Sequence, residues 1–134
     1  MKKPAKNLII SAAAGSGKTF QLTNRYISLL ANGVAPERIV ALTFTRVAAG
    51  DIFDKIVARL ADGAADKGAA AELNEQLRTS AAALLPGTAA LRCENFCCLL
   101  RTLLQRIHLC QVGTIDSFLI GILRAFPFEF GTAS

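Results

Sequence analysis

Three short stretches of this chain are mainly apolar, and each is followed by polar residues. They are Leu8–Ile10, Ile39–Thr45 and Leu109–Ile115. Short apolar runs bounded by polar residues are typical of strands that are buried on both faces of a parallel sheet. The pattern therefore predicts a parallel sheet of three strands.

Between these runs the apolar residues recur at intervals of three and four, which predicts helices. The first helix is expected over Phe20–Ala31, with Asn32-Gly33 as its C-cap, and the second over Val47–Ala61. Asp62–Ala71 is rich in Ala, Gly, Asp and Lys and is interpreted as a loop or linker.

Two further helices are expected before the third strand. The shorter has Leu73, Leu77, Ala81 and Leu84 on one side and is stopped by Pro86-Gly87. The longer has a core face of Leu91, Leu99, Leu100, Leu103, Leu104 and Ile107. After the third strand, Asp116-Ser117 is typical of a helix N-cap, and a last helix is expected over Phe118–Ala125.

A strand, a helix and a second strand joined by a short return at Pro36 form a right-handed crossover unit. The chain has 134 residues, of which 52% are hydrophobic, enough to bury the core of one domain at most. We divide it into crossover units at 1–61, a linker and helical segment at 62–109, and a last strand and helix at 110–134.

The segment after the first apolar run has the composition of a phosphate-binding loop. It reads Ala12, Ala13, Ala14, Gly15, Ser16, Gly17, Lys18, Thr19. Glycines let the backbone N–H groups wrap an anion, and a following helix adds partial positive charge at its N-terminus. Lys18 would reach the β- and γ-phosphates of a nucleotide, and the Thr19 hydroxyl would ligate Mg²⁺. The alternative is a flexible Ala/Gly/Ser turn followed by an ordinary surface lysine.

Each predicted strand ends in hydroxyl residues just before a helix. The first ends at Ser11, the second at Thr43 and Thr45, and the third at Thr114 with Ser117 close behind. In an open parallel sheet these ends share the carboxyl edge, where ligands bind. We therefore expect the hydroxyls to lie near one another.

The formal net charge of +5 suits a polyanionic partner such as nucleic acid, although the basic residues are dispersed. The four cysteines do not have the spacing of zinc ligands and are interpreted as buried, reduced thiols. Reduced thiols fit a cytoplasmic protein. His108 is expected to be packed or solvated. Lys2, Lys3 and Lys6 imitate a secretory signal, but cleavage there would destroy the loop motif. No apolar run reaches the length of a membrane span.

Three segments together resemble motifs I, Ia and Ib of UvrD/Rep-like superfamily 1 helicases. They are Ala12–Thr19, Ala41–Ala49 and Val112–Phe118. The Thr-Ile-Asp-Ser-Phe form of the third, with Phe126-Pro-Phe-Glu129 after it, is most similar to the RecB/AddA branch of helicase-nuclease proteins. The resemblance implies an α/β fold of the P-loop NTPase (RecA-like) type, with helices flanking a parallel sheet that is incomplete here.

The resemblance also implies site residues. Residues 12–19 would hold ATP and Mg²⁺, with Lys18 and Thr19 as the catalytic pair. Single-stranded DNA would be held by Thr43, Phe44, Thr45, Arg46, Thr114, Ser117 and Phe118. Arg46-Val47 replaces the usual Asn-Lys of the family, and Asp116 stands where many relatives have histidine, which favours a helix-capping role for Asp116. Partners would be single-stranded DNA or DNA ends and a second helicase-nuclease protein.

An ATP-driven motor also needs an acidic motif, arginines at the transferring phosphoryl group and a second lobe, which these residues do not supply. We therefore expect the N-terminal portion of a larger, truncated helicase that by itself binds nucleotide weakly. Two other interpretations remain. A small-molecule kinase would use Asp51 or Asp116 as base, and a non-catalytic module would bind DNA or a partner. Phe44 could also be a core aromatic at a strand end.

Overall fold

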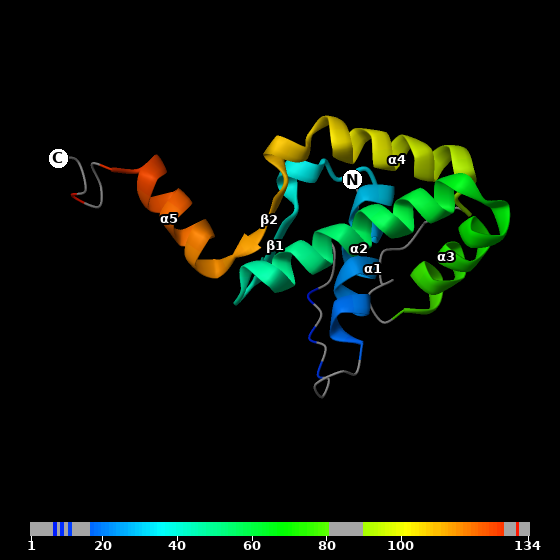
Figure 1. Cartoon of the computed structure of the whole chain (residues 1–134), viewed down its shortest axis with the longest axis horizontal. Coiled ribbons are helices and arrows are strands. Elements are labelled where there is room, and N and C mark those ends of the chain that lie inside the picture. Colours follow the sequence, from blue (N-terminus) through cyan, green and yellow to red (C-terminus); the bar gives the residue numbers. More distant parts are fainter. Residues whose placement is uncertain are drawn as a thin grey trace.

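The structure is a computed structural model, which describes residues 7, 9, 11, 17–80, 90–127 and 131. Its elements, in chain order, are α1 (Lys18–Ala31), the 3-10 turn η1 (Pro36–Arg38), β1 (Val40–Thr43), α2 (Arg46–Ala65), α3 (Lys67–Thr79), α4 (Cys93–Gln105), η2 (Ile107–Leu109), β2 (Gln111–Thr114) and α5 (Ile115–Ala125). Figure 1 shows α2 crossing the centre of the molecule, with α4 along one side of it, α3 on the other side and α1 crossing it. The result is a mixed α/β arrangement built around one long helix.

The sheet consists of two parallel strands in the described residues. β1 and β2 pair in register from Val40 opposite Gln111 to Thr43 opposite Thr114. Helix α2 packs against both strands and covers the face that carries buried Ala41, whereas Val40 and Leu42 on the other face are exposed. The two strand ends predicted to share the carboxyl edge therefore do so.

Of the predicted first strand, Leu8–Ile10, the structure describes Ile9 alone. Ile9 is not in a strand and is 95% exposed, and its described neighbours Asn7 and Ser11 are not in a strand either. The expectation of a buried strand is thus wrong for Ile9, while Leu8 and Ile10 lie outside the described residues. An apolar run favours extended backbone, but a strand also needs a neighbour with which to form hydrogen bonds.

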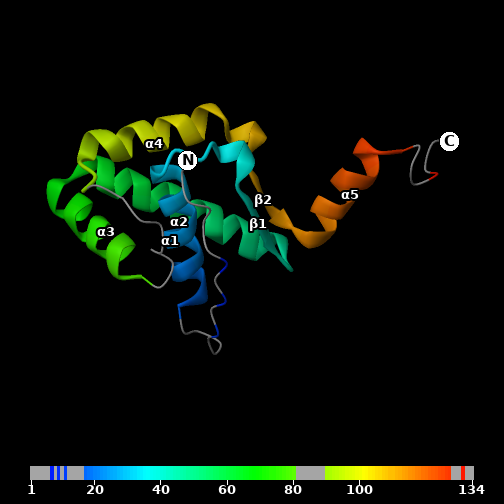
Figure 2. The same cartoon turned by 180° about the vertical axis from the view of Figure 1, so that it is seen from behind.

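The core lies between the helices. Its members are apolar side chains of α1, α2, α3 and α4 and of the segment that enters β1: Tyr26, Ile27, Leu30, Ile39, Ala41, Ile52, Ile56, Leu60, Ala70, Leu73, Leu77, Phe96 and Leu103. From the opposite side, Figure 2 shows α4 lying along α2 over much of its length. The core thus belongs mainly to the helical part of the chain.

The interpretation of Asp62–Ala71 as a loop is wrong. Helix α2 continues to Ala65, and α3 begins at Lys67, so Asp66 alone separates them. The Asp66 carboxylate accepts a hydrogen bond from Ala69 N at 2.8 Å and caps α3. Gly63, which looked like a loop residue, is buried within α2, where an added Cβ would lie 3.0 Å from the Phe96 ring. It permits close approach of α2 and α4 and does not interrupt the helix.

The other predicted helices are found with shifted boundaries. α1 ends at Ala31 with Asn32 as its C-cap, as expected, and α5 begins three residues early because Thr114, not the Asp116-Ser117 pair, is its N-cap. In α4 Leu103 is buried, whereas Leu104 and Ile107 of the predicted core face are exposed. Ala81, Leu84, Pro86 and Gly87 lie outside the described residues.

The cysteine interpretation is wrong for two of the four residues. Cys97 and Cys98 are exposed on α4, and Cys93 and Cys110 are half-buried. Burial raises the pKa of the Cys110 thiol. His108 is exposed, one of the two states expected for it. Among the described residues, no group of three potential metal ligands occurs and no helix is long and apolar enough to cross a bilayer.

Helix α5 stands apart from the body of the molecule. Figure 1 shows it extending away from the sheet toward the C-terminus. None of its residues is fully buried, and Leu119, Ile120 and Leu123 are exposed. Its attachment depends on contacts with the ends of β1 and β2.

Candidate functional site

Gly17 starts the first helix in a conformation that favours glycine. It is the N-cap of α1 and has φ 87° and ψ 16°, in the left-handed region. A side chain would be strained there although the space around it is open. Lys18 follows as the first helical residue and is exposed, and Thr19 is partly exposed. Ala12, Ala13, Ala14, Gly15 and Ser16, the rest of the expected phosphate loop, lie outside the described residues.

The connection from β1 to α2 is held by the hydroxyls of Thr43 and Thr45. Thr43 Oγ1 donates to the Thr45 carbonyl oxygen at 2.8 Å, and Thr45 Oγ1 accepts from Ala48 N at 3.2 Å as the N-cap of α2. An accepting hydroxyl keeps its own hydrogen to donate elsewhere. Between them Phe44 is 89% exposed, which excludes the alternative of a core aromatic.

These two segments meet at one cavity of about 310 Å³. It is lined by Lys18, Thr19, Leu22, Thr43, Phe44, Thr45, Ala48 and Ile52. Residues from the start of α1 and from the β1–α2 connection are therefore brought together although they are distant in the sequence. The described lining contains no acidic side chain.

The first turns of α1 and α2 share an unusual charge pattern. Each contains a cation, Lys18 or Arg46, and neither contains an acidic residue. A basic residue at a helix N-terminus adds to the positive end of the helix dipole and is unfavourable unless an anion compensates it. The first turn of α3 also has a cation, Lys67, and no acidic residue, but there the Asp66 carboxylate caps the helix, and the first turns of α4 and α5 contain Glu94 and Asp116. The positive ends of α1 and α2 thus favour a negatively charged ligand.

The hydroxyls after β2 form a helix cap. Thr114 Oγ1 accepts from Ser117 N at 3.1 Å and donates to Ser117 Oγ at 2.8 Å. Thr114 is buried, while Ser117 is exposed. Because Thr114 pairs with Thr43, both connections begin at the same edge of the sheet, and Thr43 Oγ1 lies 3.4 Å from the Gly113 carbonyl oxygen.

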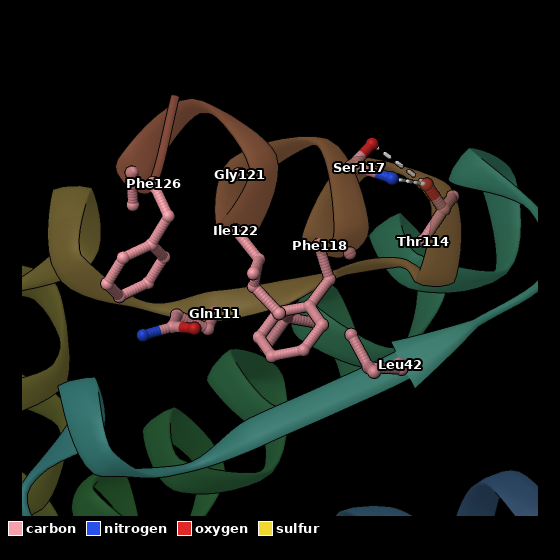
Figure 3. Close-up of a pocket in the computed structure, with 11 residues that line it drawn as sticks. Leu42, Gln111, Thr114, Ser117, Phe118, Gly121, Ile122 and Phe126 are labelled. Atoms are coloured by element: carbon pink, nitrogen blue, oxygen red, sulfur yellow. Dashed lines mark hydrogen bonds between the residues drawn. The ribbon is translucent and has the colours of Figure 1, made fainter. Parts of the chain in front are cut away.

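Phe118 lies elsewhere. Figure 3 shows Phe118, Ile122 and Phe126 pointing from α5 toward the strands, with Leu42 on the facing strand. They line an apolar groove of about 350 Å³ between α5 and the uncovered face of the sheet. Of the residues predicted to bind DNA, the structure brings Thr43, Phe44 and Thr45 to the Lys18 cavity. The other four do not line it, and three of them line the groove beside α5 instead: Thr114, Ser117 and Phe118. The fourth is Arg46.

One cluster next to the site was not anticipated from the sequence. Arg59 of α2 places its guanidinium carbon 4.8 Å from the centre of the Phe20 ring, and Phe20 directly follows Thr19. Arg59 Nη1 also donates to Thr23 Oγ1 at 2.9 Å. Burial lowers the pKa of Arg59. No sequence signal pointed to this arginine, because its partners are on other helices.

Comparison with known proteins gives the family. The UvrD/REP helicase N-terminal domain matches residues 1–134. The chain is 35% identical over 129 residues to the A subunit of the ATP-dependent helicase/nuclease of Streptococcus uberis, covering 94% of this chain and 8% of that protein. It is 30% identical over 113 residues to the corresponding protein of Lactococcus lactis, covering 84% of this chain and 7% of the relative.

A shorter and stronger likeness covers 55 residues of the same helicase/nuclease protein from Limosilactobacillus reuteri, at 47% identity, 41% of this chain and 4% of that protein. The chain thus spans less than a tenth of the length of these relatives. No solved structure matches it significantly. With the helicase domain matched from the first residue to the last, this chain belongs to the UvrD/REP helicase family.

Proposed function

We propose that this chain is the ATP-binding and DNA-binding N-terminal part of an ATP-dependent DNA helicase of the helicase-nuclease type. The observation that carries the proposal is the cavity in which Lys18 and Thr19 meet Thr43, Phe44 and Thr45. The cavity brings the segment expected to bind phosphate next to the segment expected to bind nucleic acid. A motor that couples ATP to movement on DNA requires both segments close together.

Nucleotide would bind at the start of α1. Lys18 would hold the β- and γ-phosphates, the Thr19 hydroxyl would ligate Mg²⁺, and backbone N–H groups of residues 12–17 would wrap the phosphates. The donor set fits a nucleotide with its metal, because an ammonium, a hydroxyl and an acid-free helix N-terminus are combined there. Bound Mg²⁺ would neutralise phosphate charge, while Lys18 would orient the phosphates.

Single-stranded DNA would bind along the β1–α2 connection. The exposed Phe44 ring offers a stacking surface to any base, and Arg46 offers charge to a phosphate. The Thr45 hydroxyl, whose oxygen already accepts from Ala48 N, can donate its hydrogen to a phosphate oxygen. Ser117 is the exposed hydroxyl after β2, and buried Thr114 would act by shaping that turn.

For the whole protein we propose unwinding and DNA end processing in the cytoplasm, together with a second helicase-nuclease protein. The acid-free cavity disfavours the kinase interpretation, because neither Asp51 nor Asp116 is in its described lining to serve as base. A non-catalytic module would bind the same ligands without turnover, so an ATPase assay of the whole protein with single-stranded DNA separates it from the helicase.

The test is a pair of titrations. A fluorescent ATP analogue with Mg²⁺ should bind the wild type more tightly than Lys18→Ala, with Lys67→Ala as the control at an exposed lysine. Oligonucleotides of unrelated sequence should all bind Phe44→Ala more weakly than the wild type, because stacking does not depend on base identity. Equal nucleotide affinity in wild type and Lys18→Ala would refute the nucleotide assignment.

A further inference from the structure

The contacts of Arg59 form a continuous chain from α3 to the first turn of α1. Arg59 Nη2 donates to Gln76 Oε1 at 2.7 Å, and Gln76 Nε2 donates in turn to Glu72 Oε1 at 3.0 Å. On the other side Arg59 Nη1 donates to Thr23 Oγ1, which donates to the Phe20 carbonyl oxygen at 2.9 Å. The Gln76 amide and the Thr23 hydroxyl each accept from Arg59 and donate to another oxygen, so the orientations of both groups are determined.

The chain of contacts ends at the residue that follows Thr19. Phe20 is held twice, by its carbonyl oxygen through Thr23 and by its ring under the Arg59 guanidinium. A second link joins the same helical turn to the end of α3, where Ser80 Oγ donates to Gln21 Oε1. The position of Lys18 and Thr19 relative to α2 and α3 thus depends on side chains that follow them in α1: Phe20, Gln21 and Thr23.

Arg59 is suited to this task by its shape. Its planar guanidinium can stack on a ring while donating hydrogen bonds at its edge, which a lysine ammonium cannot do. It is half-buried, and its hydrogen-bond acceptors are a neutral hydroxyl and a neutral amide. Burying a cation is costly unless its donors make hydrogen bonds. The contacts with Thr23, Gln76 and the Phe20 ring therefore favour one position of the Arg59 side chain.

We propose that Arg59 is a positioning residue of the nucleotide site. By tying α1 to α2 and α3, it holds the first turn of α1 where Lys18 can meet phosphate and Thr19 can meet Mg²⁺. This inference rests on the proposed nucleotide function of that turn. It assigns to Arg59 no contact with the nucleotide.

The first test measures affinity for the fluorescent ATP analogue with Mg²⁺ and with a chelator, at a temperature where circular dichroism shows each variant folded. Arg59→Met should weaken binding about three- to tenfold in Mg²⁺ and reduce the gain that Mg²⁺ confers, because the first turn of α1 loses its fixed position. Arg59→Lys should rescue it only in part. The matched control is Arg101→Met, which removes an exposed arginine of α4. Affinity and Mg²⁺ gain of Arg59→Met equal to those of the wild type would overturn the proposal.

The second test needs no nucleotide. The Gln21 amide donates to the Gly17 carbonyl oxygen at 2.9 Å and reports on the first turn of α1. Arg59→Met should accelerate its hydrogen exchange relative to Leu29 near the other end of the helix. Equal acceleration of both amides would indicate general destabilisation and refute positioning.

Two further outcomes keep the inference separate from folding and from the proposed function. If Arg59→Met does not fold, Gln76→Met removes one link of the chain of contacts and should give smaller changes of the same sign; unchanged exchange would refute the inference. If Lys18→Ala binds nucleotide as tightly as the wild type while the Gln21 amide still responds to Arg59→Met, the nucleotide role of Lys18 is refuted, whereas the positioning of the first turn of α1 by Arg59 is supported.

Discussion

Gly63 and Gly50 allow one substitution to be tested in two places on the same helix. Both glycines are within α2, and Ala is the better helix former by about 1 kcal/mol. At Gly50 an added Cβ would have nothing within 4 Å. Gly50→Ala should therefore raise the free energy of unfolding by up to about 1 kcal/mol.

At Gly63 the same methyl group would meet the core. Its Cβ would lie 3.0 Å from Phe96 Cδ2 and Cγ and 3.2 Å from Leu73 Cδ2. Phe96 is 0% exposed, so its ring has no solvent to move into. Overpacking of this kind costs about 1–3 kcal/mol, which exceeds or cancels the gain in helix propensity. Gly63→Ala should therefore be destabilising by up to about 2 kcal/mol.

Urea denaturation followed by circular dichroism gives the two free energies, and the difference between the variants removes the shared propensity term. We expect Gly63→Ala to be less stable than Gly50→Ala by about 1–3 kcal/mol, with Tm values that differ by roughly 3–5 °C for each kcal/mol. If the two variants are equally stable, α2 and α4 are not in the close contact on which the packing argument rests.

Three other substitutions or reactions test separate features. Val47 is 75% exposed and close to Phe44 in sequence. Val47→Lys should tighten single-stranded DNA binding and steepen the slope of log affinity against log salt by about 0.7. An unchanged slope would mean that the DNA binds elsewhere. Asp66→Ala removes the cap of α3 and should lower the free energy of unfolding by about 1 kcal/mol in a urea titration, whereas Asp54→Ala, on the exposed face of α2, should have little effect. Iodoacetamide should modify exposed Cys97 and Cys98 before Cys110, because burial raises the pKa of the Cys110 thiol. Mass mapping that finds Cys110 modified first would contradict the structure.

Much of the local structure could be predicted from the chain alone. The apolar spacing located α1, α2, β1, β2 and α5 to within a few residues, and the expected parallel sheet is found in the parallel orientation of β1 and β2, although their pairing as neighbours was not predicted. The motif order also identified the helicase family, which the comparison over residues 1–134 bears out. These features depend on periodicity and on short segments, which a linear sequence displays directly.

The remaining features depended on contacts between segments that are distant in the chain. Glycine-rich composition suggested a loop at Gly63. In the structure Gly63 lies within α2, because its missing side chain allows the helix to pack closely against Phe96. The exposure of Phe44 and the role of Arg59 are likewise set by which helices meet, and Arg59 reaches Thr23 across 36 positions. Sequence alone therefore determined most of the helices, the positions of β1 and β2 and the family. Tertiary structure decided which side chains share the cavity, because packing and hydrogen bonding between elements are not encoded in any local spacing.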